Sequence, residues 1–190
     1  MKKVFLFLSS LLIVHCTIAQ DSKVSATLSY PLPIGDNSLG SYTGVVDVGL
    51  QVRFINAGPI KIGLSANAGY FSRSNELDPA FTIKGKVYLI QPRVFAELQL
   101  ESLTKLKPFA GLGYSLNLLD IEYEDAQNPH DYDDSTGGIN VNIGAAYDFT
   151  NRFFALVQFD FLKVSRDNPN QNNDFFRNSN ILKVGLGLRF

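Results

Sequence analysis

Strict alternation between apolar and other residues is the feature that most constrains this chain of 190 residues. From Ile139 to Phe149 every odd-numbered residue is apolar, whereas the even-numbered residues are Asn, Gly, Ala or Asp. The segment that ends at Phe190 repeats the pattern, with an apolar residue at every second position from Leu182. Because successive side chains of a β-strand point to opposite faces, each segment is predicted to be a strand with one apolar face.

Six further segments carry the same alternation. With the two above, the predicted strands are Val24 to Tyr30, Val45 to Phe54, Ile60 to Phe71, Val87 to Leu100, Phe109 to Leu119, Ile139 to Phe149, Phe153 to Val164 and Ile181 to Phe190. Most are about ten residues long, the length that a tilted strand needs to cross the hydrocarbon core of a membrane. The sequence therefore predicts an all-β fold, an eight-stranded antiparallel up-and-down transmembrane β-barrel.

The connections between these segments alternate in length. Asn56 to Pro59 and Thr150 to Asn151 are tight turns, and Glu101 to Lys107 is a connection of intermediate length. The longer connections are rich in polar residues and span Pro31 to Thr43, Ser72 to Lys86, Glu122 to Gly138 and Ser165 to Asn180. Short periplasmic turns and four long outer loops are the asymmetry expected of an outer-membrane barrel.

The N-terminal residues have the composition of a secretory signal peptide, because two lysines precede an apolar run that ends in small residues at Ala19. We therefore expect a signal peptide over residues 1–19 and a barrel domain over residues 20–190. Cys16 raises the alternative of a lipoprotein signal. The bulky His15 argues against it, since lipid attachment prefers a small residue at that position.

Removal of this signal narrows the chemistry that the chain can perform. The only cysteine leaves with it, so disulfides and thiolate chemistry are excluded from the mature chain. Loss of Lys2 and Lys3 changes the formal net charge from −1 to −3, which gives no electrostatic reason to bind nucleic acid. Phosphate-binding glycine loops are absent, and we predict no cofactor.

The face of the strands that is not apolar is typical of a crowded interior. The exposed face of a soluble protein is usually about 25 to 35% charged, whereas this face consists mostly of Gly, Ser, Thr, Asn and Gln. Its charges are of both signs, as burial requires. Because an eight-stranded barrel is narrow, we predict a polar network that fills the lumen, made of Asp47, Arg53, Lys61, Arg93, Glu97, Asp148, Asp160, Lys183 and Arg189. The alternative is a set of solvated charges on a soluble sheet.

The apolar face carries almost no charge until the strand ends, where aromatic residues recur. These are Tyr30, Phe54, Tyr70, Tyr88, Tyr114, Tyr147, Phe149, Phe153 and Phe190. Aromatic girdles of this kind occur at the two membrane interfaces of such barrels. Pro92 falls inside the fourth predicted strand, where it removes a donor from the ladder, so we expect a bulge or local bend there.

Residues suited to catalysis are scarce. After the signal the only histidine is His130, in the third long loop and without a serine partner on a strand, so we predict that the protein is not an enzyme. The same loop carries Asp131, Asp133 and Asp134, whose oxygens are candidate ligands for a hard cation such as calcium. Their spacing does not match an EF-hand, and a solvated acidic loop is the alternative.

The C-terminal sequence ILKVGLGLRF, with its aromatic last residue, resembles the assembly signal of outer-membrane barrels. Together with the AQ dipeptide at the end of the signal and PFAGLGY at residues 108–114, it makes the chain similar to outer-membrane β-barrel domain proteins of Bacteroidetes, of the porin-family, PorT-like type. The resemblance implies a place in the cell outer membrane of a Gram-negative bacterium. It also implies that the barrel assembly machinery reads Phe190. It describes an architecture rather than an activity.

Three functions fit this architecture. The first is a structural or surface-interaction protein, surrounded by outer-membrane lipids, whose loops contact an unknown partner or lipopolysaccharide. The second is a narrow pore or transport accessory, which requires an open lumen that inward-facing Arg53, Arg93, Phe95 and Glu97 make difficult. The third is a soluble periplasmic ligand-binding β-barrel.

Overall fold

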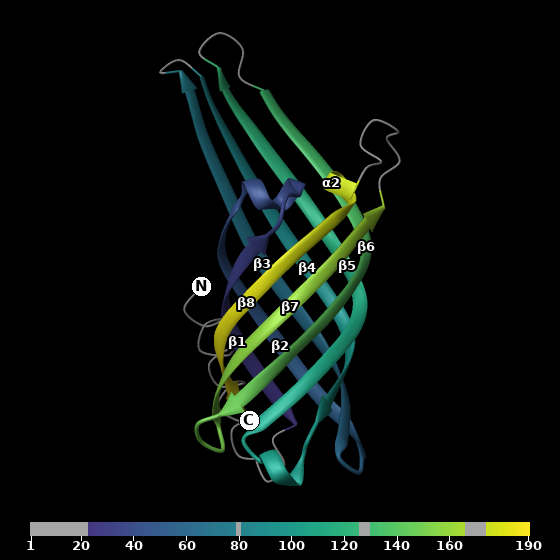
Figure 1. The fold of residues 1–190 in the computed structure, drawn as a ribbon. Helices are drawn as coiled ribbons and strands as arrows, with labels where there is room; N and C mark the ends of the chain where they lie inside the picture. Colours follow the sequence, from purple (N-terminus) through teal and green to yellow (C-terminus); the bar gives the residue numbers. More distant parts are fainter. Residues whose placement is uncertain (1–22, 79–80, 126–129, 166–173) are drawn as a thin grey trace, which may run out of the picture.

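The structure is a computed structural model that describes residues 23–78, 81–125, 130–165 and 174–190. They form a closed barrel in which each strand pairs antiparallel with the next, and β1 pairs with β8 to close the sheet (Figure 1). The prediction of an eight-stranded antiparallel barrel is confirmed. The predicted signal peptide, with Cys16, lies outside the described residues.

The eight strands range from 11 to 20 residues in length. They are β1 (Val24–Ile34), β2 (Thr43–Ala57), β3 (Ile60–Asp78), β4 (Phe81–Leu98), β5 (Leu106–Asp125), β6 (His130–Asp148), β7 (Phe153–Ser165) and β8 (Asn178–Arg189). Short helical segments in the connections are η2 (Ser38–Ser41), η3 (Glu101–Leu103) and α2 (Asp174–Arg177). We call the end of the barrel with the short turns and the C-terminus the turn end, and the end with η2 and α2 the mouth end (Figure 1).

The tight turns form at the turn end where the sequence places them. Between β2 and β3, Gly58 adopts a φ of +60°, which glycine reaches without steric cost. Between β6 and β7, the Thr150 Oγ1 accepts hydrogen bonds from the backbone N–H groups of Arg152 and Phe153, at 3.2 and 2.9 Å. Each of these turns connects two strands that are neighbours in the barrel, as an up-and-down order requires.

Two of the predicted long loops are wrong, because the strands continue through most of their length. The β3–β4 ladder extends to the pair of Asp78 with Phe81, and the β5–β6 ladder to the pair of Tyr123 with His130. These four strands therefore project beyond the others at the mouth end (Figure 1). On β3 and β6 the residues there are mostly polar, and on β4 and β5 apolar residues alternate with polar ones over only a few positions. The alternation is therefore too short to indicate a strand from the sequence, although the backbone is still paired.

The connection predicted over Pro31 to Thr43 is shorter than expected and folds inward. β1 continues to Ile34, and η2 then enters the mouth end, where Leu39 is buried. Asn37 holds this turn: its Oδ1 accepts hydrogen bonds from the backbone N–H groups of Leu39 and Gly40, at 3.1 and 3.0 Å. Its Nδ2 donates to the carbonyl of Ile34 at 2.9 Å. This connection therefore covers part of the lumen.

Of the bulge or local bend expected at Pro92, the bulge is wrong. The proline keeps its place in the β3–β4 register, and the β4–β5 register is the same on either side of it, with Ile90 opposite Leu116 and Arg93 opposite Gly113. Pairing of β4 with β5 is interrupted only between these two pairs. Proline lacks an N–H group, so a ladder bond is lost locally without insertion of an extra residue.

The outward face of the barrel is apolar around its whole circumference. One residue from each strand that is strongly exposed illustrates this: Leu28, Leu50, Leu64, Val94, Leu112, Ile143, Val157 and Leu186. At the turn end, Phe54, Phe149 and Phe153 also point outward. An apolar surface that surrounds the whole barrel is unfavourable in water and suits contact with lipid. Among the described residues, no helix has the length and apolar character needed to cross a membrane.

Candidate functional site in the barrel interior

Side chains fill the interior in layers that alternate between charged and apolar. The order is visible along β4, whose inward-facing and buried residues run Glu97, Phe95, Arg93, Gln91, Leu89 and Val87 from the turn end toward the mouth. We call the charged layer around Arg93 the central network, formed by Asp47, Arg93, Asp160 and Lys183. We call the layer at the turn end the turn-side network, formed by Arg53, Glu97, Lys107, Asp148 and Arg189.

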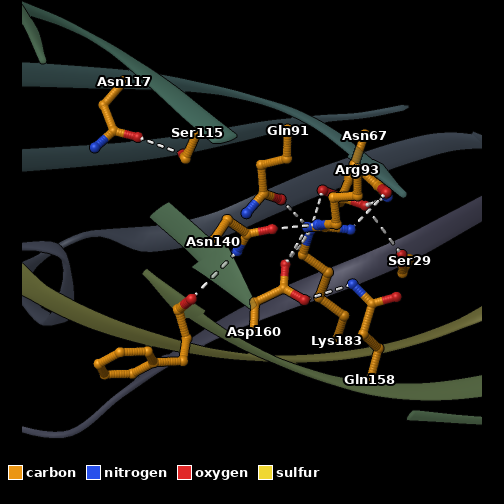
Figure 2. Close-up of polar contacts among 12 residues, drawn as sticks. Ser29, Asn67, Gln91, Arg93, Ser115, Asn117, Asn140, Gln158, Asp160 and Lys183 are labelled. Carbon is orange, nitrogen blue, oxygen red and sulfur yellow. Dashed lines mark hydrogen bonds and ion pairs between the residues drawn. The ribbon is translucent and has the colours of Figure 1, made fainter. Parts of the chain in front are cut away.

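The central network is a chain of ion pairs across the barrel (Figure 2). Asp160 Oδ2 accepts from Arg93 Nη2 at 2.7 Å and lies 3.0 Å from Lys183 Nζ. Lys183 Nζ donates in turn to Asp47 Oδ2 at 2.6 Å. None of these side chains is more than 1% exposed, so two carboxylates neutralise two cations without help from solvent.

Neutral amides give the charges of the central network their further hydrogen bonds, although Gln91 Nε2 has no partner of its own within the described residues. These amides are Asn67, Gln91, Asn140 and Gln158. Asn67 Oδ1 accepts from Arg93 Nη1 at 3.0 Å, and its Nδ2 donates to Asp47 Oδ1 at 2.7 Å. Gln91 Oε1 accepts from Lys183 Nζ at 2.9 Å (Figure 2). Buried ion pairs are tolerated when further hydrogen bonds satisfy their remaining donors and acceptors, which is the role of these amides.

The turn-side network has a surplus of positive charge. Arg53 Nη2 donates to Glu97 Oε2 at 2.6 Å, and Arg189 Nη2 donates to Asp148 Oδ1 at 2.9 Å. Lys107 Nζ lies 2.5 Å from the second oxygen of Asp148. The Lys107 and Asp148 side chains are 17% and 14% exposed. Water therefore reaches this layer and screens the charge that the two carboxylates leave unpaired.

Aromatic rings separate the two networks; they belong to Phe95, Phe109 and Phe154. A Cβ on Gly187 would lie 2.0 Å from Phe154 Cζ, and one on Gly144 would lie 2.6 Å from Phe109 Cζ. The strand glycines thus provide the space that the rings occupy, in accord with their expected role in relieving crowding. The Arg189 guanidinium lies over the Phe154 ring, 4.4 Å from its centroid, which adds a cation–π contact to this layer.

An apolar layer closes the interior toward the mouth; it consists of Leu39, Phe71, Val87, Leu89, Leu162 and Ile181. All of these are at most 7% exposed. Leu39 comes from η2, so the inward-folded connection completes this layer. Apolar residues therefore enclose the central network on both sides, whereas the sequence interpretation described a polar network with Phe95 as its one inward aromatic residue.

The predicted lumen residues lie in these two networks, with the exception of Lys61. Lys61 is half-buried at the turn end of β3 and makes no ion pair within the described part of the chain. The interpretation of the sequence missed Lys107, because it began the strand at Phe109 whereas β5 begins at Leu106. Lys107 stands two residues before Phe109, so extending the alternation by one step places it inside the barrel.

The metal candidates do not converge in the described residues. Asp133 and Asp134 are neighbours on β6, so their side chains point to opposite faces of the sheet. The side chains of Asp131 and His130 lie outside the description, although both residues are on β6 rather than in a loop. Among the side chains that are described, no group of three His, Cys, Asp or Glu residues could hold a metal ion.

Charged residues also occur on the outward face, on the strands that project at the mouth end. This outer charged patch consists of Lys84, Lys86, Asp120, Glu122 and Asp133. Lys86 Nζ donates a hydrogen bond to Glu122, and it lies 4.0 Å from Asp120 Oδ2. The hydrogen bond lowers the pKa of Glu122 and raises the pKa of Lys86. Asp133 stands directly opposite Asp120, so the patch is acidic on its β6 side.

A closed barrel with an apolar outer surface and a charged, filled interior defines the class of small integral β-barrel membrane proteins. Within that class, the chain belongs to the family described as the outer membrane protein beta-barrel domain, whose model matches residues 5–190. It is an integral outer-membrane β-barrel protein. The soluble periplasmic barrel considered as an alternative is therefore wrong, because its outer surface would have to be polar.

Solved structures of bacterial outer-membrane proteins share the fold at low sequence identity. A major outer membrane protein from Thermus thermophilus has a TM-score of 0.63 at 11% identity, covering 88% of this chain and 99% of that protein. Ail, the attachment invasion locus protein of Yersinia pestis, has a TM-score of 0.57 at 12% identity, with coverage of 88% and 96%. OprG from Pseudomonas aeruginosa has a TM-score of 0.52 at 11% identity, with coverage of 88% and 95%. None of the curated protein sequences matches this chain.

Proposed function

We propose that this protein is a sealed, non-catalytic membrane anchor that presents a surface for contacts at the outer face of the cell. The observation that carries the proposal is the filled lumen. The central network is at most 1% exposed and lies between an aromatic and an apolar layer. A continuous water path for solutes would have to displace all three, which supports the anchor over the narrow pore.

The outer charged patch is the surface that we assign to lipopolysaccharide. Lys86 lies next to Tyr88 on the outward face of β4, on the side toward the mouth end. This position is just past the apolar belt, where phosphate groups of the outer leaflet would lie. Lysine is a good ligand for phosphate as a point charge. Asp120 and Asp133 oppose each other on the same face and would favour a divalent cation between protein and phosphate.

For export and assembly of the barrel, we keep the interpretation drawn from the sequence. We infer that residues 1–19 direct export and that the barrel assembly machinery reads Phe190, in the manner of the Bacteroidetes PorT-like proteins that the chain resembles. The backbone N–H of Phe190 donates to the carbonyl of Val24 at 2.8 Å, which supports a role for this residue at the closing seam between β8 and β1.

Two measurements test the proposal. Purified protein in planar bilayers is expected to give no conductance steps, because the interior layers block the lumen. Protein in phospholipid nanodiscs is expected to bind lipopolysaccharide aggregates in a calcium-dependent sedimentation assay. A variant with Lys84→Gln and Lys86→Gln should lose most of that binding.

The matched control exchanges lysines of the same kind at the opposite end of the barrel. Lys23 and Lys105, exposed at the turn end, are replaced by glutamine, and binding should stay at the level of the unaltered protein. Steady conductance steps in the unaltered protein would overturn the sealed anchor. Equal binding by both pairs of variants would overturn the assignment of the outer charged patch.

A further inference from the structure

A cavity of about 490 Å³ lies in the mouth end, above the apolar layer that seals the lumen. Its floor is formed by Val87, Leu89, Leu162 and Val164, which are all buried. η2 bounds it on one side and Phe175 of α2 on another, so segments from both ends of the chain contribute to it. The cavity is separate from both charged networks, because the apolar layer lies between them.

The wall of this cavity carries polar groups among its apolar ones, but the described residues that line it supply no free charge. Asn117 Nδ2 lies 3.5 Å from the Thr136 hydroxyl on the facing strand, and Asn117 Oδ1 accepts from Ser115 at 3.0 Å. Arg73 and Asp134 also line the cavity, and each is already engaged in an interaction. The polar groups that remain for a ligand are therefore hydroxyls and amides.

We propose that this cavity binds a small neutral amphiphile, with its apolar body on the floor and a hydroxyl or amide group toward Asn117 and Thr136. Ligand pockets of about 300 to 1,000 Å³ with apolar linings and a few convergent polar groups are the usual form of small-molecule sites. A charged head group is disfavoured, because it would lose its hydration without gaining a free counter-charge. The inference concerns the mouth cavity alone and does not depend on the outer charged patch or on lipopolysaccharide.

The test uses 4-(trifluoromethyl)benzyl alcohol as the probe, observed by fluorine NMR with the protein in phospholipid nanodiscs. Leu118 and Leu119 form a matched pair on β5, because Leu119 lines the cavity whereas Leu118 is exposed on the lipid-facing side. Saturable binding is expected for the unaltered protein and for Leu118→Trp. Leu119→Trp fills the cavity and should weaken binding about tenfold or more.

A second variant protects the test against misfolding of the first. Ser41 lines the same cavity from η2, outside the barrel strands, so Ser41→Trp fills the space without disturbing the ladder. Heat-modifiable gel mobility shows which variants are folded. The analogue 4-(trifluoromethyl)toluene, which lacks the hydroxyl, should bind more weakly than the alcohol. Signal changes equal to those of empty nanodiscs, or equal affinity in folded Leu119→Trp, Ser41→Trp and unaltered protein, would overturn the proposal.

Discussion

The two charged layers of the interior both combine carboxylates with arginine and lysine, but they differ in charge balance and in exposure to solvent. The central network contains Asp47 and Asp160 against Arg93 and Lys183, so its formal charges cancel. The turn-side network contains two carboxylates against three cations, and part of it is open to solvent. The difference shows that charge balance is imposed where apolar layers exclude water, and relaxed where water supplies screening.

The physical reason lies in the cost of desolvation. An unpaired ion in a dry interior loses several kcal/mol of hydration, so each charge of the central network must meet an opposite charge and saturated hydrogen bonds. At the turn end, Asp148 keeps some contact with water, and its loss leaves Lys107 still partly hydrated, whereas Arg189 stays buried. Removing one carboxylate from each layer and measuring the loss in free energy of unfolding therefore shows how well that layer excludes water.

The largest effect is expected for Asp160→Asn in the central network. The amide leaves Arg93 and Lys183 to share Asp47 as the nearest carboxylate, and removal of one partner from a buried ion network costs about 3–5 kcal/mol. The free energy of unfolding is measured by urea titration of the protein in phospholipid vesicles, with heat-modifiable gel mobility as the readout. Asp36→Asn, at an exposed position, is the control. A loss no greater than that of the control would mean that water reaches the central network.

A double variant sharpens the argument that balance, rather than charge itself, is required. Lys183→Met leaves Asp47 and Asp160 with Arg93 as the remaining cation of the network. Adding Asp47→Asn restores one carboxylate for one cation. The double variant should be more stable than the sum of the single losses by about 1–3 kcal/mol, the coupling typical of residues in one network. Strict additivity in the same urea titration would contradict the coupling.

A smaller effect is expected for Asp148→Asn in the turn-side network. Asp148 accepts from Arg189 Nη2 at 2.9 Å and pairs with Lys107, but both ends of the latter pair are partly exposed. Loss of charge-assisted hydrogen bonds that solvent can replace should cost about 1–2 kcal/mol. If this variant is destabilised as strongly as Asp160→Asn, the contrast between the layers is wrong.

The alternation of side chains was sufficient to predict the fold. Apolar residues at every second position gave the strands and their order, because a lipid-facing surface demands that pattern on every strand. The projecting parts of β3 to β6 were missed for the same reason: beyond the lipid, nothing in the environment requires apolar residues, so Ser72 to Lys86 reads as a loop. Strand pairing there depends on backbone hydrogen bonds, which leave no trace in the side-chain pattern.

The content of the lumen was predictable only in part. Charges such as Arg93 and Lys183 could be placed inward by parity, but which cation meets which carboxylate depends on how strands distant in sequence face one another. Lys183 and Asp47 are 136 residues apart, and their contact follows from closure of β1 on β8. The inward fold of η2, which buries Leu39, was likewise hidden, because a short polar connection has no periodicity from which to predict it.

The smallest effect is expected for Glu122→Gln in the outer charged patch, since exposed ion pairs contribute little. The pKa of Glu122 is lowered in the folded protein, so its contribution is complete above the carboxyl pKa of the unfolded chain and is lost as the pH falls through the folded value. The pKa of Lys86 is raised, so the contribution is also lost at alkaline pH. Urea titrations should therefore separate Glu122→Gln from the unaltered protein at neutral pH and not in acid. Glu101→Gln, exposed on η3, is the matched control, and a difference that persists in acid would show that Glu122 acts through packing rather than charge.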